Sequence, residues 1–524
     1  MKNRVKRGLA AALLTSALWA PLAQAATDEQ KKTAEAGVEA QTKQIQVMVD
    51  QVFSYAEPGF QEVRTSAYLT DILEKNGFKV TRGVAGIPTA FTATWGSGGP
   101  LIALGSDIDN LLGVLQYPGI PNVKPMVAGA PGHGEGHNSG MPLVIAAAIA
   151  TKAVMEKNHI PGRLMIWPGV AEELLGSKAY YVKAGLFKDV DACIFVHVAS
   201  EFGTGYGDLG HNGMVSVEYT FHGKTAHAAG DPWDGRSALD AVELMDTAWN
   251  YRREHLPLTQ RSHYVITNGG GQPNVVPDLA SVWYYFRDRT FGDVKSLYDT
   301  GNEIADAAAK ATGTTVERRV LGYAAPNFAN KPLAEAAYLN IKAVGMPKWD
   351  ADDQAFAKAV QETNHRKVAP LADTVEALST PESRPRPMGG GSDDIGDIMW
   401  TVPTITIRYP SNIPNMIGHN VLSAMAMATP IAHKGVVVGA KAVAMTLLDL
   451  MTTPKLLADA KDYFTNVQLK TDSYQPILEK PAIWLNEKTM REMRPQMEQY
   501  YYNPKKYPTY LDQLGIKWPT VTPK

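Results

Sequence analysis

Four short apolar runs bounded by turn residues stand out along the chain, and each has the length and composition of a buried β-strand. They are LIALGSD from residue 101, RLMIW from 163, ACIFVHV from 192 and TITIRY from 404. Helix-like stretches alternate with them, such as the alanine-rich MPLVIAAAIATKAVMEK that begins at Met141. Alternating strands and helices are typical of a sheet with helices on its faces. The pattern therefore predicts an α/β fold whose main domain is an α/β/α sheet.

Between residues 213 and 327 the hydrophobic pattern changes. The run VSVEYTF places apolar side chains at every second position, and a second alternating run, SVWYYFR, ends at Arg287. Alternation of this kind predicts antiparallel strands with one half-exposed face. Between them, SALDAVELMDTAWNYRREH has helical spacing, with Ser237 as a candidate N-cap and an apolar face of Leu239, Val242, Met245 and Trp249. Residues 213–327 are therefore predicted to form a smaller α+β domain inserted into the main one.

The N-terminus has the pattern of an export signal. Cationic residues among the first seven precede an apolar run, Leu9–Leu22, which is followed by the small-x-small sequence AQA at 23–25. A retained membrane anchor is the alternative, but the run is shorter than the roughly 20 apolar residues of a membrane-spanning helix and contains Pro21. We expect cleavage after Ala25, a periplasmic or secreted protein, and no stable membrane anchor.

The chain thus divides into five predicted segments. These are the signal peptide at 1–25, the first part of the main, catalytic domain at 26–212, the inserted domain at 213–327, the second part of the catalytic domain at 328–454, and an extension at 455–524. The extension is rich in Tyr, Pro and Lys, as in YYYNPKKYPTYLDQ. We interpret it as an irregular segment that packs on the surface.

The composition narrows the classes of partner. Lys plus Arg number 51 and Asp plus Glu number 53, which gives a formal net charge of −2 at pH 7. No charge excess attracts nucleic acid or an anionic membrane, so a small neutral or weakly charged partner fits better. The one cysteine, Cys193, lies in the apolar run ACIFV, and the chain therefore has no intramolecular disulfide.

The loop GAPGHGEGHNSG, residues 129–140, combines dense glycine with metal-ligand chemistry. Each glycine costs backbone entropy on folding, so this density indicates a tight loop rather than a stable helix or strand. Within the loop, Glu135 and His137 are separated only by glycine. We expect the glycines to let both side chains approach the same metal centre.

Residues of the same chemistry follow the predicted strands, where open α/β sheets bind their ligands. A divalent-cation site needs His, Asp or Glu ligands that converge from different segments. Of the adjacent pair Glu172 and Glu173, one can bind metal while the other takes a proton from a metal-activated water. These residues predict a metallohydrolase with the candidate ligands Glu135, His137, Glu173, His197 and His419.

Other motifs have weaker support. GYGDLG, residues 205–210, matches the dinucleotide-binding pattern G-x-G-x-x-G, but a strand-like segment follows it in place of a helix whose N-terminus could face a pyrophosphate. The sequence contains no G-x-S-x-G, H-E-x-x-H or Walker A motif. A dinucleotide site, a serine hydrolase and a helix-based zinc protease are therefore not predicted.

From about Val47 to Leu448 the chain resembles the co-catalytic metallo-aminoacylase and carboxypeptidase family, in its amidohydrolase branch. The matching segments are GSDIDNLL, HGEGHN, AEE, VHV, TAHAAGDPWDGRSALDAVELM, NGGGQPNVVPD, GGGSDDIGDIMWTVPT, GHN and AHKG. Their order and spacing make the resemblance specific. It implies a catalytic base at Glu172 and metal ligands at His137, Glu173, His197 and His419.

The inserted domain resembles the dimerisation, or lid, domain of the same family. His227 matches a histidine that reaches the substrate, commonly in the partner subunit, although a local hydrogen bond in the lid is the alternative role. Asn274 and Arg287 match lid residues that can bind a carboxylate or carbonyl oxygen of the substrate. Arg287 at a strand end is equally consistent with a solvated or paired surface charge. The resemblance thus implies a homodimer formed through the lid.

Glu135 is the main departure from the family. The amidohydrolase branch usually has a metal-binding cysteine at this position, in H-x-C-G-H. A carboxylate can bridge two cations through its two oxygens, so the substitution need not abolish the site. Replacing a thiolate with a carboxylate weakens the preference for zinc and makes manganese more acceptable. We therefore expect two divalent ions, zinc or manganese.

Other polar residues are assigned supporting roles. His133 is expected to be a partner of the ligands or solvent-exposed, and not a ligand itself. Asp107 and Asp109 are candidates for orienting a ligand or a loop through hydrogen bonds. Architecture around the site is the role expected of Asp393, Asp394 and His433.

The expected activity is hydrolysis of the amide bond of N-acyl or aminobenzoyl amino acids by a metal-activated water, with Glu172 as general base. A dipeptidase or carboxypeptidase of the same family would use the same residues. A non-catalytic, exported protein that binds metal or ligand is the alternative from another class. Glu172 beside Glu173 argues against that alternative, because a binding protein needs no unliganded base next to its metal.

Overall fold

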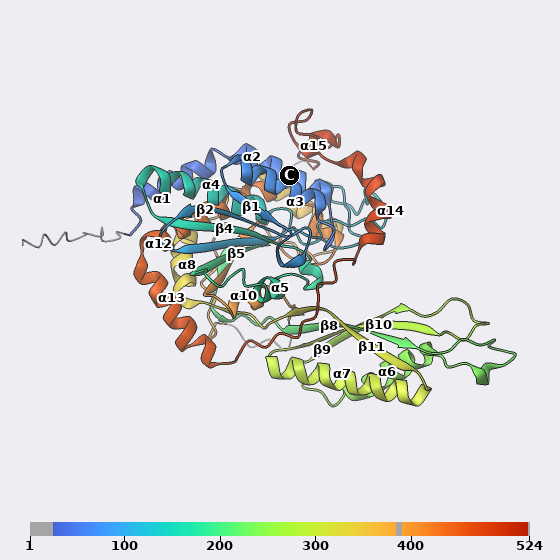
Figure 1. Cartoon of the computed structure of the whole chain (residues 1–524). Helices are drawn as coiled ribbons and strands as arrows, with labels where there is room; N and C mark the ends of the chain where they lie inside the picture. Colours follow the sequence, from blue (N-terminus) through green and yellow to red (C-terminus); the bar gives the residue numbers. More distant parts are fainter. Residues whose placement is uncertain (1–24, 384–389, 522–524) are drawn as a thin grey trace, which may run out of the picture.

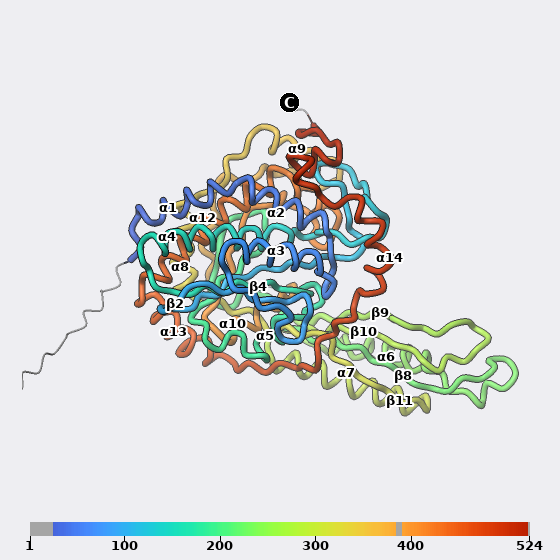
Figure 2. The backbone as a smooth tube through the Cα atoms, turned by 45° about the horizontal axis from the view of Figure 1, so that its top comes forward, coloured from blue at the N-terminus to red at the C-terminus, as the bar shows by residue number. Residues whose placement is uncertain are grey.

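The computed structural model describes residues 25–383 and 390–521, so the expected signal peptide, apart from Ala25, lies outside the described residues. A larger domain surrounds a seven-stranded sheet, and a smaller domain projects away from it (Figures 1 and 2).

The sheet of the larger domain has the order β1-β2-β4-β3-β5-β13-β6. Its strands are β1 (Lys79–Arg82), β2 (Phe91–Ser97), β3 (Leu101–Asp107), β4 (Gly162–Gly169), β5 (Ala192–Ala199), β6 (Gly203–Thr204) and β13 (Thr404–Pro410). The central strands β4, β3, β5 and β13 are parallel, and the outer pairs are antiparallel. These four central strands are the four apolar runs of the sequence, and most of their residues are apolar because helices cover both faces of the sheet.

Helices lie on both faces of this sheet. On one face α4 (Gly140–Asn158) and α12 (Pro430–Thr452) pack against each other and against β3 and β13, with α1 (Asp28–Glu39) and α2 (Thr42–Tyr55) beside them. On the other face α5 (Lys178–Lys183) contacts α10 (Ile395–Met399) (Figure 1). Helix α12 is long and apolar enough to cross a membrane, but 83% of its apolar window is buried, as in a core helix.

The remaining elements of the larger domain are shorter or more peripheral. They are α3 (Val63–Lys75), α8 (Lys331–Val344), α9 (Ala351–Thr363), α11 (Val421–Ala424), the strands β7 (Gly207–Asp208) and β12 (Phe328–Ala329), and single 3-10 turns such as Glu172–Leu174.

The smaller domain is a four-stranded antiparallel sheet in the order β11-β8-β10-β9. Its strands are β8 (Gly213–His222), β9 (Arg261–Asn268), β10 (Leu279–Asp288) and β11 (Thr315–Ala324), and its helices are α6 (Ala238–Arg253) and α7 (Phe291–Thr312). Alternate residues of β8 are buried against these helices, and the Ser237 hydroxyl caps α6 by accepting from the Asp240 N–H. The fold is therefore an α/β domain with an inserted α+β domain, as the sequence predicts.

The extension after residue 455 is more regular than predicted. It contains α13 (Pro454–Asn466), α14 (Glu487–Met497) and the short α15 (Tyr510–Gln513). The segment runs along the larger domain (Figure 2), where the Tyr510 N–H donates to Asp50 and the Tyr502 N–H to Ser54. The prediction of an irregular segment was wrong for these helices. Their stability comes from tertiary packing of buried residues such as Met490 and Tyr510, which local composition does not reveal.

Candidate metal centre

The candidate site lies at the carboxyl edge of the parallel strands. Glu172 and Glu173 form a 3-10 turn shortly after β4, and His197 is near the end of β5. The glycine-rich loop follows β3 and leads into α4. Since parallel strands end at the same edge, these segments bring their side chains together.

Glu135 occupies the middle of the cluster, and its two carboxylate oxygens face different partners. Oε2 lies 3.3 Å from His137 Nε2 and 3.3 Å from His197 Nε2. Oε1 lies 3.0 Å from His419 Nε2, which is also 3.4 Å from Glu173 Oε2. The structure therefore brings all five predicted ligands together, with Glu135 between a His137–His197 pair and a Glu173–His419 pair.

Surrounding groups orient the candidate ligands. Asp109 Oδ1 lies 3.5 Å from His137 Nδ1, while Asp109 Oδ2 accepts from the Glu173 N–H at 3.1 Å. His197 Nδ1 donates to the Val198 carbonyl oxygen at 2.9 Å. When Nδ1 of a histidine carries the proton, Nε2 presents its lone pair, as a metal ligand must. Asp109 thus fits the orienting role considered for it from sequence.

The electrostatics of the cluster suit a cation. Burial opposes charge on Glu135, but hydrogen bonds from the imidazoles of His137, His197 and His419 hold the pKa of its carboxyl well below the usual value. Burial and the nearby Glu135 carboxylate raise the pKa of Glu173 to about 8. Divalent ions would supply the positive charge that these clustered carboxylates and imidazoles lack, and the His and Glu donor set is one that such ions use, so the residues fit two such ions.

Glu172 lies beside these ligands. One of its oxygens is within 4.8 Å of ligand atoms of His137 and Glu173. Burial and the carboxylates of Asp107 and Asp393 raise the pKa of Glu172 well above its usual value. A carboxyl group with raised proton affinity next to a metal site is suited to accept and return a proton.

Near Glu172 lies a buried lysine, Lys178, that no motif in the sequence indicates. Lys178 Nζ donates to Asp107 at 2.6 Å and also to Asp394, and it lies 3.7 Å from Asp393. These contacts place Asp107, Asp393 and Asp394 in the architecture of the site. Lysine is common on the exposed faces of helices, so the sequence of α5 does not indicate that Lys178 is buried.

Two further histidines have structural contacts. His133 is buried, not exposed, and its Nε2 donates to the Val52 carbonyl oxygen at 3.2 Å. Burial lowers the pKa of His133 to about 3, so this ring is neutral. His433 lies 2.7 Å from Asp50, which also holds the C-terminal extension.

The glycines of the loop let its backbone lie close to neighbouring segments, and they also allow backbone conformations that other residues rarely adopt. A Cβ on Gly132 would lie 2.5 Å from the Val114 carbonyl oxygen. Gly136, directly between Glu135 and His137, has φ +123°, which side-chain-bearing residues rarely adopt. A Cβ on Gly136 would also lie 2.5 Å from the Met427 side chain.

A cavity of about 210 Å³ opens onto the cluster, and the base of the smaller domain contributes to it. Arg287, on β10, lines this cavity with Glu172, Glu173 and His419, and its guanidinium lies over the Tyr285 ring at 5.3 Å. Arg408 and His211, which belong to none of the motifs in the sequence, line it as well.

His227 and Asn274 do not join this cluster. The Ala228 N–H donates to the Asn274 carbonyl oxygen, which holds the two loops together. His227 and Asn274 are both exposed, and they lie beyond the end of β8. In the sheet, Gly213 pairs with Asp288 near the larger domain, whereas His222 pairs with Leu279 at the other end. Ten antiparallel residues span about 30 Å, so His227 and Asn274 lie far from Glu172 of the same chain.

Comparisons with known proteins agree with this arrangement. The family profile described as a peptidase dimerisation domain, M20_dimer, matches residues 209–313. The chain is 34% identical to one of the subunits of p-aminobenzoyl-glutamate hydrolase of Escherichia coli (strain K12) over 457 residues, 81% of this chain and 92% of that protein. It is 28% identical to Xaa-Arg dipeptidase of Mus musculus over 79% of this chain and 87% of that protein.

A solved structure shares the fold. The aminobenzoyl-glutamate utilization protein from Klebsiella pneumoniae superposes with a TM-score of 0.50 at 16% identity, covering 80% of this chain and 97% of that one.

Proposed function

The chain belongs to the M20 peptidase family and is an amide-bond hydrolase, and from this premise we propose that it is a two-metal amidohydrolase of N-acyl or aminobenzoyl amino acids. The observation that carries the proposal is the pairing of a five-ligand cluster around Glu135 with an unliganded carboxyl group, Glu172, beside it.

The ligands divide into two sets that share Glu135. One ion would be held by His137, His197 and Glu135 Oε2, and the other by Glu173, His419 and Glu135 Oε1. When bound, divalent ions would polarise the scissile carbonyl and make water more acidic. The carboxylate of Glu135 supports manganese as well as zinc, because oxygen ligands do not impose the preference of a thiolate.

The proton moves through Glu172. Its carboxylate takes a proton from the attacking water as the water oxygen bonds to the carbonyl carbon. The resulting Glu172 acid then returns that proton to the amide nitrogen as the C–N bond breaks, so the products are a carboxylic acid and an amine. The raised pKa of Glu172 makes its carboxylate a stronger base for the first half of this transfer.

Arg287 is proposed to bind a carboxylate or carbonyl oxygen of the substrate, since it lines the cavity beside the candidate ligands. His227 and Asn274 are proposed to act from the lid of a second copy in a homodimer, because they lie far from Glu172 in their own chain. There they would donate hydrogen bonds to the oxyanion of the tetrahedral intermediate.

The decisive variant is Glu172→Gln, which keeps the size of the side chain but accepts no proton. We expect kcat to fall by at least about 100-fold against aminobenzoyl-, benzoyl- and indoleacetyl-amino acids, with metal content unchanged. Glu335→Gln, an exposed carboxylate on α8, is the matched control and should behave as wild type. Near-normal hydrolysis by Glu172→Gln would refute the assignment of the base.

A dipeptidase is the second candidate, because the similarity to Xaa-Arg dipeptidase also covers most of the chain. Dipeptides belong in the same assay panel, since both activities use the same residues.

We also propose export and removal of residues 1–25. N-terminal sequencing of protein from the periplasmic fraction should then begin at Ala26. Intact Met1 in the membrane fraction would contradict this.

A further inference from the structure

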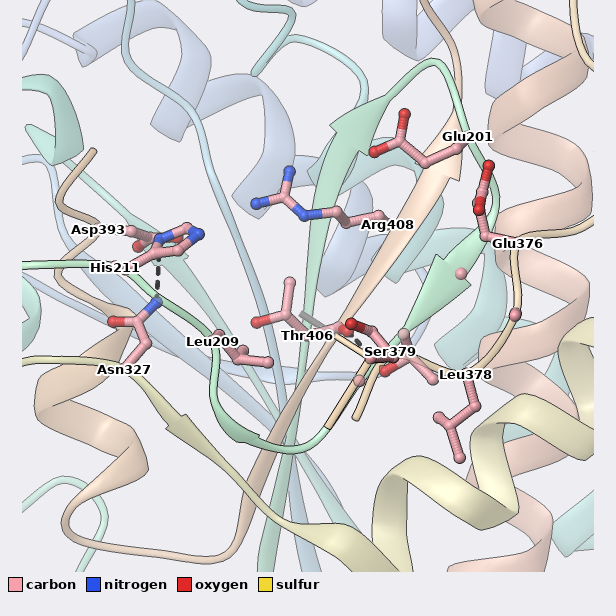
Figure 3. A pocket seen from close by; sticks show the side chains of 15 residues that line it. Glu201, Leu209, His211, Asn327, Glu376, Leu378, Ser379, Asp393, Thr406 and Arg408 are labelled. Atoms are coloured by element: carbon pink, nitrogen blue, oxygen red, sulfur yellow. Dashed lines mark hydrogen bonds between the residues drawn. The ribbon is translucent and has the colours of Figure 1, made fainter. Parts of the chain in front are cut away.

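A second, larger cavity adjoins the metal centre. It encloses about 450 Å³, and its lining includes Glu201, Glu376, Leu209, Leu378, Thr406 and Arg408 (Figure 3). Arg408, His211 and Asp393 line both this cavity and the one that opens onto the metal ligands. A substrate bound at the metal centre can therefore extend into the second cavity.

Backbone hydrogen bonds fix the wall that carries the two glutamates. The Glu376 N–H donates to the Phe202 carbonyl oxygen at 2.9 Å, and the Ser379 N–H donates to that of Thr204 at 3.1 Å. Gly203 lies directly against Glu376, because a Cβ on this glycine would be 3.1 Å from Glu376 Cβ. The backbone next to Glu201 and at Glu376 is thus held by hydrogen bonds between the two segments.

Neither carboxylate of this wall has a cationic partner in the described part of the chain. Glu201 accepts a hydrogen bond from the Ser200 hydroxyl at 3.0 Å, but neither Glu201 nor Glu376 forms an ion pair within residues 25–383 and 390–521. Two negative groups that face one cavity attract a cation, and they repel a ligand that carries a carboxylate there.

Two further polar groups point to a ligand. Thr406 is only 8% exposed, and its hydroxyl, which faces the cavity in Figure 3, has no hydrogen-bond partner in the described part of the chain. Arg408 pairs in register with His197 of the metal centre, yet its guanidinium forms no hydrogen bond or ion pair with a described residue. In Figure 3 Arg408 lies between His211 and Asp393 on one side and Glu201 and Glu376 on the other.

We propose that this cavity binds the cationic side chain of a basic amino acid, so that the preferred substrates are amides or dipeptides in which lysine or arginine supplies the amide nitrogen. The inference rests on the proposed function. In such a substrate the α-carboxylate is two bonds from the scissile nitrogen, which suits Arg408 beside the metal centre.

The side chain of the substrate then extends along the cavity. Its methylene groups contact Leu209 and Leu378, and its ammonium or guanidinium group meets Glu201 and Glu376. The Thr406 hydroxyl accepts or donates one further hydrogen bond. A glutamate side chain in the same position would face two carboxylates.

The test compares N-benzoyl-arginine with N-benzoyl-citrulline, which has nearly the same shape and no charge, on the metal-loaded mature protein. We expect kcat/KM to be at least about tenfold higher for the arginine substrate, because a charge-assisted hydrogen bond is stronger than a neutral one. In the double variant Glu201→Gln/Glu376→Gln this ratio should fall to about one. Glu335→Gln, a carboxylate outside the cavity, should keep the wild-type ratio.

Equal rates for arginine and citrulline in the wild type, or an unchanged ratio in the double variant, would overturn the proposal. Calorimetric titration of the metal-loaded protein with free arginine, citrulline and glutamate separates this inference from the hydrolase proposal. If no amide is cleaved, tighter binding of arginine that depends on Glu201 and Glu376 still supports the cavity assignment. Arginine binding no tighter than citrulline refutes it independently of catalysis.

Discussion

At the scale of single residues, Glu135 determines the character of the site. The sequence predicts it as a ligand because it replaces a cysteine of the family, and the structure gives its two oxygens separate partners. A sulfur atom at the same place is one ligand atom, whereas the carboxylate is two. Glu135 could therefore be chosen as a candidate ligand from sequence, but the separate partners of its two oxygens depend on side-chain geometry.

Replacement of Glu135 should change metal binding in a graded way. We expect Glu135→Ala to lose most of its bound metal, because both ligand pairs lose the group they share. Glu135→Cys should retain metal but shift selectivity from manganese toward zinc, since a thiolate is the softer ligand. Elemental analysis after equilibration with equal zinc and manganese measures both effects. Wild-type metal content in Glu135→Ala would show that this carboxylate is not a ligand.

The buried Lys178 should be essential for stability. It is fully buried and contacts Asp107 and Asp394, so Lys178→Met leaves buried carboxylates without a counter-charge. Removal of one member of a buried ion pair typically costs about 3–5 kcal/mol. Denaturant unfolding should show a loss of this size, and adding Asp394→Asn should restore part of it. A double variant less stable than Lys178→Met would contradict this pairing.

Glu62 should make stability depend on pH. Burial and the Asp109 carboxylate raise the pKa of Glu62 from 4.5 to about 8. Between these values the folded state binds more protons than the unfolded state, so stability falls as pH rises, by up to about 1.4 kcal/mol per pH unit. Glu62→Gln does not titrate, and its Tm relative to wild type should therefore increase from pH 5.5 to pH 9. A Tm difference that is constant over this range would contradict the raised pKa.

At the scale of elements, the spacing of hydrophobic residues and the burial of each element explain which predictions succeeded. The four apolar runs became central strands because a buried strand needs apolar residues on both faces. The alternation in β8 and β10 predicted the inserted sheet because a strand with one buried face has apolar residues at every second position. The helices of the extension were not predicted because a helix such as α14 has low overall hydrophobicity, and only its Met490 and Met497 are buried. A few anchors that pack on a distant surface leave little periodic signal.

The glycine-rich loop should be intolerant of substitution at Gly136. Its φ of +123° and the nearby Met427 side chain both disfavour a Cβ. Gly136→Ala should lower stability by about 1–3 kcal/mol and reduce bound metal, because the loop must displace Glu135 or His137. Gly83→Ala is the control, since Gly83 has φ +69° but no atom within 4 Å of its Cβ position. Equal metal content in the two variants would refute the link between loop conformation and ligand placement.

At the scale of the whole molecule, the proposed functional residues of the lid lie at two opposite ends of this domain. Arg287 lies at the base, beside the metal centre, while His227 and Asn274 lie beyond the other end of the sheet. The sequence identifies all three as candidates, but it contains no information on this separation, which follows from the length and register of β8 and β10. If His227 acts in catalysis, a second copy must bring it to Glu172.

Mixed dimers test this arrangement. A dimer of one His227→Ala chain and one Glu172→Gln chain, isolated with two affinity tags, should have about half of wild-type activity, because one of its two sites combines an intact Glu172 with an intact His227 from the other chain. A dimer of wild type with the doubly substituted chain should be nearly inactive, since its only intact Glu172 faces a lid without His227. Action of His227 within its own chain predicts the reverse result for the two dimers. Activity of the His227→Ala homodimer equal to wild type would instead leave this histidine with only a local role in the lid, where its Nδ1 accepts from the N–H of Gly230.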